Sequence, residues 1–218
     1  MNRIPVVAVS IGMATGIYAI SFGALGVTAG LTTLETMLLS LVMFSGASQF
    51  AFVGVVATGG MAAIPTAIAS AWLLGVRNGF YALRMAPVLG MPGIAKMLSA
   101  QLTIDESTAV ATAQSNPADE RRGFWWTGAS VFVFWNLMTL AGALLGDQIG
   151  DPANFGLDSA AAAAFLGLVW PRLNSNLYRL IGLTALIVAI AASPFVSAGI
   201  PVLLGALVAA IIQYWGSR

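Results

Sequence analysis

Small and polar side chains interrupt a long apolar stretch at residues 43–50, which read MFSGASQF. The surrounding stretch, Thr36–Thr58, is long enough to cross a bilayer as a helix. Gly and Ser are weak helix formers, and the amide of Gln49 is costly in hydrocarbon. A helix break here would expose backbone groups, and the half-helix starting near Phe50 would point its positive end at the break. An anionic group such as a carboxylate would bind there.

The candidate binding residues at this break are Ser45, Gly46, Ala47, Ser48 and Gln49. The alternative is a tight helix crossing of small residues, in which Gln49 bonds to a neighbouring helix.

A second segment, GVRNGFYALRMAP at residues 75–87, places a charge inside an apolar stretch. Charges inside a membrane are expensive and usually functional, so Arg77 is a candidate binding residue. Arg77, Tyr81 and Arg84 have the spacing of one helix face. Asn78, beside Arg77, indicates a loosened turn. We therefore add Asn78 and Tyr81 to the candidates; the alternative is that Arg77 reaches the interface and only marks a loop.

The third segment, QLTIDESTAVATAQS at residues 101–115, carries two acids. A helix through it would align one polar stripe, and Asp105 belongs to that stripe. Glu106 points about 100° away, and Thr103-x-x-Glu106 has the form of a capping box. We therefore expect Asp105 to face a pathway and Glu106 to cap the helix, and either acid is a candidate for proton coupling or for binding the substrate ammonium. The alternative is that both acids only start a helix at the membrane surface. The stripe consists of Gln101, Asp105, Thr108, Thr112 and Ser115.

The composition restricts what these residues can do. The chain has 218 residues, 59% hydrophobic and 8% charged, with a net charge of +1 and neither His nor Cys. An average soluble domain is about 25% charged, so the composition indicates a membrane protein. The net charge gives no footprint for nucleic acid. Without His or Cys, a Cys/His metal site and a thiol nucleophile are excluded, and a proton carrier inside the membrane would be Asp105 or Glu106. We predict no enzyme activity, no cofactor and no metal.

Eight apolar segments lead to the expected fold, an all-α polytopic transmembrane helical bundle with about seven to eight membrane segments and broken helices. The whole chain, residues 1–218, is expected to be a single integral membrane domain. The first segment runs too far to be a cleaved secretory signal. The segments are Ile4–Ala29, Thr36–Thr58, Met61–Leu83, Ile94–Ala113, Gly123–Leu145, Ser159–Trp170, Leu177–Ala192 and Val196–Trp215.

An internal repeat is also predicted. Residues 22–46 and 140–171 both run from Gly-Ala-Leu through a turn and a Leu-acid pair into a helix of small residues. The repeat halves would be about 4–90 and 123–215, with related helix breaks near 45–49 and 159–171. Three G-x-x-x-G pairs predict close helix contacts: Gly12/Gly16, Gly26/Gly30 and Gly142/Gly146.

The Lys and Arg residues predict the orientation. With the N-terminus inside, most of them fall on the cytoplasmic side and Glu35 falls outside. Arg84 and Lys96 fall on the wrong side if every segment is a full span. Either the region 77–105 is re-entrant, or the third and fourth segments are drawn incorrectly.

The chain resembles the AzlC family, the large subunits of branched-chain amino acid exporters. The resemblance lies in F-S-G-A-S-Q-F, R-N-G-F-Y-A-L-x-M-A-P, the D-E pair, and G-L-D followed by small residues up to L-V-W-P, and covers about residues 10–175. It implies export of small apolar amino acids and a small membrane partner of the AzlD type. Two positions depart from the family pattern: Asn78 stands where His is usual, and Ile104 displaces a Thr.

The expected function is therefore secondary transport of branched-chain or other small apolar amino acids out of the cell, driven by the proton gradient. The expected location is the bacterial cytoplasmic membrane, as a multi-pass protein with an AzlD-type partner or as a homo-oligomer. Two alternatives stay open: a membrane scaffold for a partner, and a channel for small solutes. The positions of Arg77 and Asp105 relative to a cavity would discriminate among them.

Overall fold

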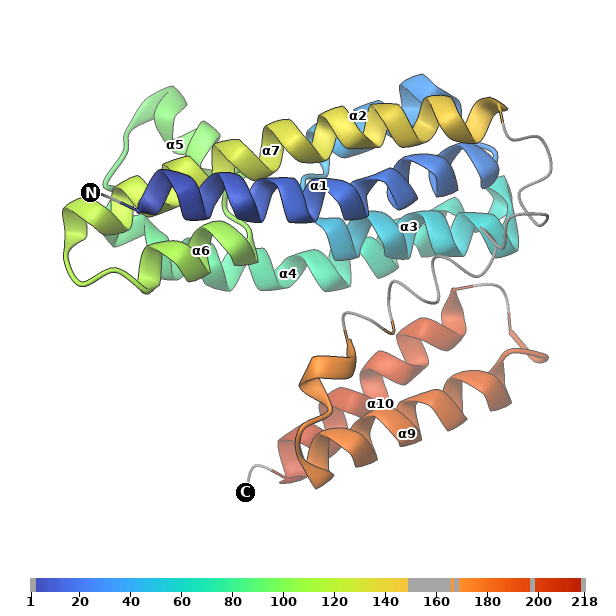
Figure 1. The fold of residues 1–218 in the computed structure, drawn as a ribbon. Helices are drawn as coiled ribbons and strands as arrows, with labels where there is room; N and C mark the ends of the chain where they lie inside the picture. Colours follow the sequence, from blue (N-terminus) through green and yellow to red (C-terminus); the bar gives the residue numbers. More distant parts are fainter. Residues whose placement is uncertain (1–2, 149–165, 167–168, 197–198, 217–218) are drawn as a thin grey trace.

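A computed structural model describes residues 3–148, 166, 169–196 and 199–216. All regular secondary structure in this part of the chain is helical, without a strand, as the sequence predicted (Figure 1). The helices are α1 (Ile4–Thr28), α2 (Thr33–Val42), α3 (Gly46–Gly59), α4 (Ile64–Leu89), α5 (Gly93–Gln101), α6 (Asp105–Thr112), α7 (Pro117–Gln148), α9 (Asn176–Ala192) and α10 (Ile200–Gly216), with 3-10 turns at Met61–Ala63 and Trp170–Arg172.

Helices α1 and α7 lie side by side along the whole bundle (Figure 1). Gly12 faces Ser130 and Gly146 faces Ala24, so the two helices run parallel. The missing side chains let the backbones approach closely, which confirms two of the predicted G-x-x-x-G contacts. The third is only half right, because Gly26 packs on α2 whereas Gly30 lies in a turn with φ of +95°. The seam glycines are Gly12, Gly16 and Gly23 on α1 and Gly142 and Gly146 on α7.

Helices α2 and α3 form a hairpin that enters and leaves at the same end of the bundle. The chain leaves helix geometry at residues 43–45 and resumes it at Gly46, so the expected break is confirmed slightly earlier than predicted. The side chain of Gln49 on α3 donates to the carbonyls of Leu39 and Ser40 on α2, which places the two helices antiparallel. We call α2, residues 43–45 and α3 the first hairpin.

Helices α5 and α6 form a second hairpin, with the break at residues 102–104. The sequence predicted one continuous helix over Ile94–Ala113, and that prediction is wrong. Ile104 is extended, the Thr103 hydroxyl donates to the Ser99 carbonyl, and the Ser107 hydroxyl accepts from the Ile104 N–H. These local side-chain bonds compete with a continuous helix. Gln101 and Asp105 therefore do not share one helix, and the predicted stripe is not continuous.

The two hairpins enter from opposite ends, and their tips meet in the middle of the bundle. Arg121 at the start of α7 donates from Nε to the Val88 carbonyl at the end of α4, 2.6 Å away, so α5 starts at that end. At the tip of the second hairpin, Gln101 Nε2 donates to the Leu41 carbonyl of the first, at 2.7 Å. Half-helices that end against each other inside a membrane are typical of transporter binding sites.

Each hairpin follows a long helix, and the two long helices share a sequence motif. Residues 16–20 of α1 read GIYAI and residues 79–83 of α4 read GFYAL. Since α1 and α4 run in opposite directions, α1–α3 and α4–α6 have the same order of a long helix and a hairpin in opposite directions, which is the arrangement expected of an inverted repeat (Figure 1). The predicted first half, 4–90, is fully described, but the predicted second half, 123–215, contains residues 149–165, which the structure does not describe. The predicted break near 159–171 falls largely on such residues, so the repeat of 4–90 with 123–215 stays a prediction.

The second hairpin accounts for the charges that the sequence map placed on the wrong side. Because α4 returns to the end where α7 begins, Arg84 and Lys96 lie at the same end as Arg121. Glu35 in the first turn of α2 lies at the other end. Both alternatives therefore hold in part: the segment that turns back is 93–112 rather than 77–105, and the fourth predicted segment, Ile94–Ala113, was drawn incorrectly as one helix.

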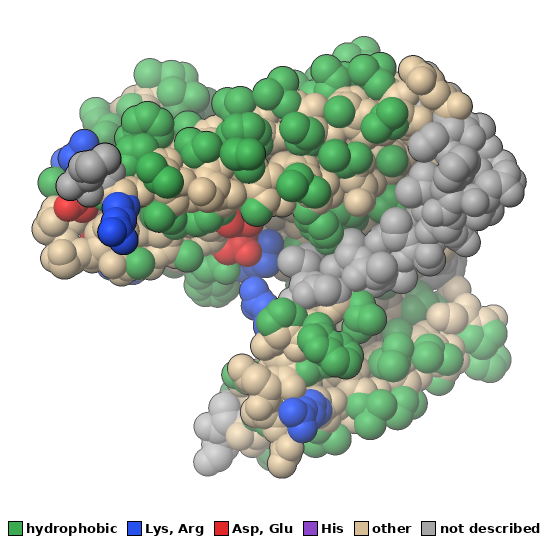
Figure 2. Space-filling view, in the orientation of Figure 1, with side chains coloured by type: hydrophobic (Ala, Val, Ile, Leu, Met, Phe, Trp, Pro, Cys, Tyr) green, Lys and Arg blue, Asp and Glu red, His purple; other side chains and the backbone are tan. Residues whose placement is uncertain are grey.

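By length and composition, two described helices could cross a membrane: α1 and residues 117–146 of α7. Helix α4 has 26 residues and carries Arg77 and Arg84. Helices α9 and α10 pack mainly against each other and expose many large apolar side chains. Figure 2 shows that apolar side chains also cover most of the visible bundle surface, as expected for a surface in lipid.

Candidate functional site

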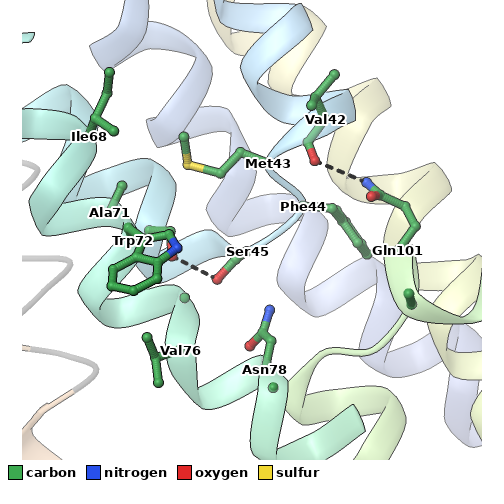
Figure 3. A pocket seen from close by; sticks show the side chains of 14 residues that line it. Val42, Met43, Phe44, Ser45, Ile68, Ala71, Trp72, Val76, Asn78 and Gln101 are labelled. Atoms are coloured by element: carbon green, nitrogen blue, oxygen red, sulfur yellow. Dashed lines mark hydrogen bonds between the residues drawn. The ribbon is translucent and has the colours of Figure 1, made fainter. Parts of the chain in front are cut away.

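An open pocket of about 510 Å³, called the cavity below, lies where the first hairpin tip, the middle of α4 and the end of α5 meet (Figure 3). Several of its lining side chains, such as Val42 and Trp72, are mostly exposed. Its polar lining consists of Ser45, Ser48, Asn78 and Gln101. Its apolar lining includes Val42, Met43, Phe44, Ile68, Trp72 and Val76. A mostly apolar cavity with a few convergent polar groups has the character of a small-molecule site.

The start of α3 supplies the anion-favouring side of this cavity. Ser45 is extended and precedes the first helical residue, and the Ser48 hydroxyl donates to the Ser45 hydroxyl at 3.1 Å (Figure 3). The first N–H groups of a helix have no partner within that helix, and its dipole favours negative charge there. Of the predicted binding residues at the break, Ser45 and Ser48 line the cavity.

The remaining break residues pack into the core. Gln49 is fully buried, donates to the Met43 carbonyl at 3.0 Å and accepts from Trp135 Nε1 at 2.9 Å. Gly46 lies against the same Trp135 ring, and Ala47 is buried. The amide of Gln49 thus bonds to carbonyls at the end of the broken helix, of which those of Leu39 and Met43 also accept from backbone N–H groups. This is the alternative in which Gln49 bonds to a neighbouring helix.

Asn78 is the only one of the three predicted α4 residues that lines the cavity. Its Oδ1 atom is buried and has no hydrogen-bond partner among the described residues, so it can accept a hydrogen bond from a bound molecule. Tyr81, one turn further along α4, is half-buried and lies away from the cavity lining.

Arg77 and Asp105 form an ion pair of 3.6 Å between α4 and the first residue of α6. Their side chains are 30% and 40% exposed, and neither lines the cavity. Glu106 is half-buried and lies beside Asp105. Figure 2 shows acidic and basic side chains together midway along the bundle. The ion pair therefore lies neither in the cavity nor at an end of the bundle. Those were the two positions expected to discriminate between a transporter and a scaffold, so the position of the pair does not decide between them.

The predicted capping box between Thr103 and Glu106 is wrong. The N-cap of α6 is Ile104, and Ser107 takes the third position of the first turn, where Glu106 was expected. The Thr103 hydroxyl donates to Ser99 instead. Glu106 is therefore free of the structural role that the sequence gave it.

Most of the residues that line the cavity were not binding candidates from the sequence, and Gln101 and Trp72 are the two whose side chains matter most for binding. Gln101 was assigned to a stripe on a helix that does not exist, and Trp72 gave no signal within an apolar stretch. The polarity of Gln101 inside an apolar segment was a usable signal; the position of Trp72 depends on how α4 packs.

Comparison with protein-family models gives a match to the family described as AzlC protein, over residues 10–149. Comparison with curated proteins gives no match, and neither does comparison with solved structures. The matched range covers well over half of the chain and contains both hairpins and the cavity. The chain therefore belongs to the AzlC family, whose members are membrane proteins related to branched-chain amino acid transport.

Proposed function

We propose that the protein is a secondary transporter that exports branched-chain or other small apolar amino acids across the bacterial cytoplasmic membrane, coupled to protons. The observation that carries this proposal is the cavity between two re-entrant hairpin tips in the middle of the bundle. Family membership supports amino acid transport. The direction, the coupling ion and the location in a bacterial inner membrane are our proposals.

The lining of the cavity suits an amino acid with an apolar side chain. Ser45 and Ser48 at the start of α3 suit its carboxylate, and the free Oδ1 of Asn78 suits a donor group. Trp72 and Val76 on α4 give an apolar wall for the side chain. Among the described residues, the lining contains no charged side chain, which disfavours acidic and basic amino acids.

The cluster of Arg77, Asp105 and Glu106 supports proton coupling. Arg77 pairs with Asp105, and Glu106 lies beside Asp105, so the cluster carries one negative charge in excess when all three are ionised. Charge in a low-dielectric region is costly, and one bound proton neutralises the cluster. The cluster connects α4 with the second hairpin, whose tip borders the cavity.

A small AzlD-type membrane subunit or a second copy of the chain is proposed as the partner. The support is the family membership together with the large apolar side chains that α9 and α10 expose. Lipid covers such a surface equally well, so assays are required with and without the partner.

The test is transport of labelled valine and methionine in proteoliposomes, with and without a pH gradient and with and without the partner. Gly79→Leu would fill the cavity, because nothing lies within 4 Å of a side chain there. Phe80→Leu, at the neighbouring and mostly exposed position, is the matched control. We expect gradient-driven transport that Gly79→Leu abolishes and Phe80→Leu retains. Transport with no dependence on the gradient would indicate a channel, and no transport of either amino acid with the partner present would indicate a scaffold.

A further inference from the structure

The hairpin tips bring the C-terminal ends of two half-helices together at one side of the cavity. Helix α2 ends at Val42 and α5 ends at Gln101, and both residues line the cavity (Figure 3). The last carbonyls of a helix have no partner within that helix, and its C-terminal end carries a partial negative charge. This side of the cavity therefore has the opposite polarity to the start of α3.

The amide of Gln101 bonds to these carbonyls. Its Nε2 atom lies 2.7 Å from the Leu41 carbonyl and 3.4 Å from the Val42 carbonyl, so one side chain joins the two hairpins. The shorter distance lies within the usual range for an N–H···O bond. A primary ammonium group has three N–H donors and a full positive charge, so it suits the same two acceptors better than a neutral amide.

We propose that the Leu41 and Val42 carbonyls bind the ammonium group of the transported amino acid, and that Gln101 is a latch which this ammonium displaces. The proposal rests on the proposed function and names the chemistry of its substrate, a zwitterion with a free primary ammonium. The ammonium lies at the ends of α2 and α5, and the carboxylate lies at the start of α3.

Displacement of Gln101 breaks a direct bond between the hairpins. The hairpins belong to different halves of the inverted repeat, and each is attached to its own long helix. Binding of substrate thereby releases one half of the repeat to move against the other. An amino acid exporter that uses such a latch moves its hairpins when it is loaded and holds them together when it is empty.

The distance between the hairpins can be measured directly, because the chain has no native cysteine. Spin labels on Leu38→Cys and Met97→Cys would report this distance, since both positions are exposed and lie outside the cavity lining. The probes are L-valine, isobutylamine, which keeps the ammonium, and isovalerate, which keeps the carboxylate. We expect valine and isobutylamine to increase the distance and isovalerate to leave it unchanged.

Two latch variants complete the test in the same labelled protein. Gln101→Leu removes the donor, and Gln101→Glu keeps the side-chain size but repels the carbonyls. Both should shift the hairpins toward the separated state by about tenfold without ligand, the scale of one hydrogen bond. Gln114→Leu is the matched control, because Gln114 donates to the Val110 carbonyl within its own hairpin. It should leave the distance as in the wild type.

The proposal is overturned if both latch variants keep the wild-type distance, or if isovalerate moves the hairpins and isobutylamine does not. The outcome for the proposed function is separate. If valine is not transported while isobutylamine still separates the hairpins, the proposed function fails and the ammonium site stands. If valine is transported but the hairpin distance in Gln101→Leu equals that in the wild type, the latch fails and the proposed function stands.

Discussion

At the scale of single residues, Gln49 shows how a polar side chain can be the support of a site rather than its ligand. Its amide nitrogen faces three carbonyls at the end of the first half-helix, and its amide oxygen accepts from Trp135. A broken helix in the membrane interior leaves carbonyls that neither water nor lipid satisfies. Gln49 bonds to carbonyls at the break and so fixes the position of Ser45 and Ser48 at the cavity.

Gln49→Leu should therefore destabilise the protein. It leaves the Trp135 N–H without its partner and removes the amide from the Ser40 carbonyl, at a cost of about 1–3 kcal/mol for a buried unsatisfied group, whereas the Leu39 and Met43 carbonyls keep their backbone N–H donors. Trp135→Phe should cost less, because it leaves the Gln49 donor bonds intact. The measurement is the melting temperature in detergent, with Gln114→Leu as control. Equal melting temperatures for Gln49→Leu and the wild type would contradict this role.

Arg77→Ala should abolish transport while the protein still inserts into the membrane. The substitution leaves Asp105 without the cation 3.6 Å away, and an unpaired charge in a low-dielectric region is costly. The double variant Arg77→Ala/Asp105→Asn removes that charge and should be more stable than Arg77→Ala alone. Export assays normalised to membrane protein level, with melting curves, test both statements. Wild-type export by Arg77→Ala would exclude a function for the pair.

Ser107→Ala and Glu106→Gln should separate capping from transport chemistry. The Ser107 hydroxyl accepts from the Ile104 N–H and donates to the Leu102 carbonyl, so its loss should destabilise the start of α6 by about 0.5–2 kcal/mol. Glu106 makes no such cap, so Glu106→Gln should keep the melting temperature and lose the dependence of transport on pH. If Glu106→Gln has a lower melting temperature than Ser107→Ala, the assignment of Ser107 as the capping residue of α6 is wrong.

At the scale of elements, the seam between α1 and α7 depends on glycine. Gly142 faces the backbone of Ile20 so closely that any side chain at this position would push the helices apart. Gly142→Leu should therefore prevent stable folding, whereas Gly79→Ala, which meets open space in α4, should keep or raise the melting temperature. Fluorescence-detected size-exclusion chromatography, with heating before the column, measures the folded fraction and the melting temperature of both variants. A monodisperse Gly142→Leu protein would mean that the seam tolerates a gap.

The start of α2 should respond to acid. Glu35 accepts from the N–H and the hydroxyl of Thr32, and these bonds lower its pKa below the ordinary value of 4.5. Because the pKa of Glu35 is lower in the folded protein, its cap stabilises α2 fully at pH values above the ordinary pKa. This stabilisation is lost as the pH falls through the lowered pKa of the folded state. Melting curves between neutral and acidic pH should show a loss that is smaller in Glu35→Gln, which can still cap. The same acid sensitivity in both proteins would assign it to another group.

At the scale of the whole molecule, the two hairpins predict a definite sidedness. Lys96 should be accessible from the side of Arg84 and Arg121, and Leu34, beside Glu35, from the opposite side. Single cysteines at Lys96 and Leu34, labelled with an impermeant thiol reagent on sealed vesicles, test this, because the chain has no cysteine of its own. Labelling of both from the same side would mean that the hairpins do not enter from opposite ends.

The sequence by itself determined the all-helical class, the first helix break and the residues of the charge cluster, because apolarity, small residues and charge in an apolar stretch are local properties. It could not determine that Ile94–Ala113 folds back, since the bonds that end α5 compete with the helix only once Ser99, Thr103 and Ser107 lie in position. Nor could it tell that Gln101 borders the cavity while Arg77 does not. Which face of α4 meets the hairpin tips is decided by packing between segments far apart in the chain, and that packing exists only in the tertiary structure.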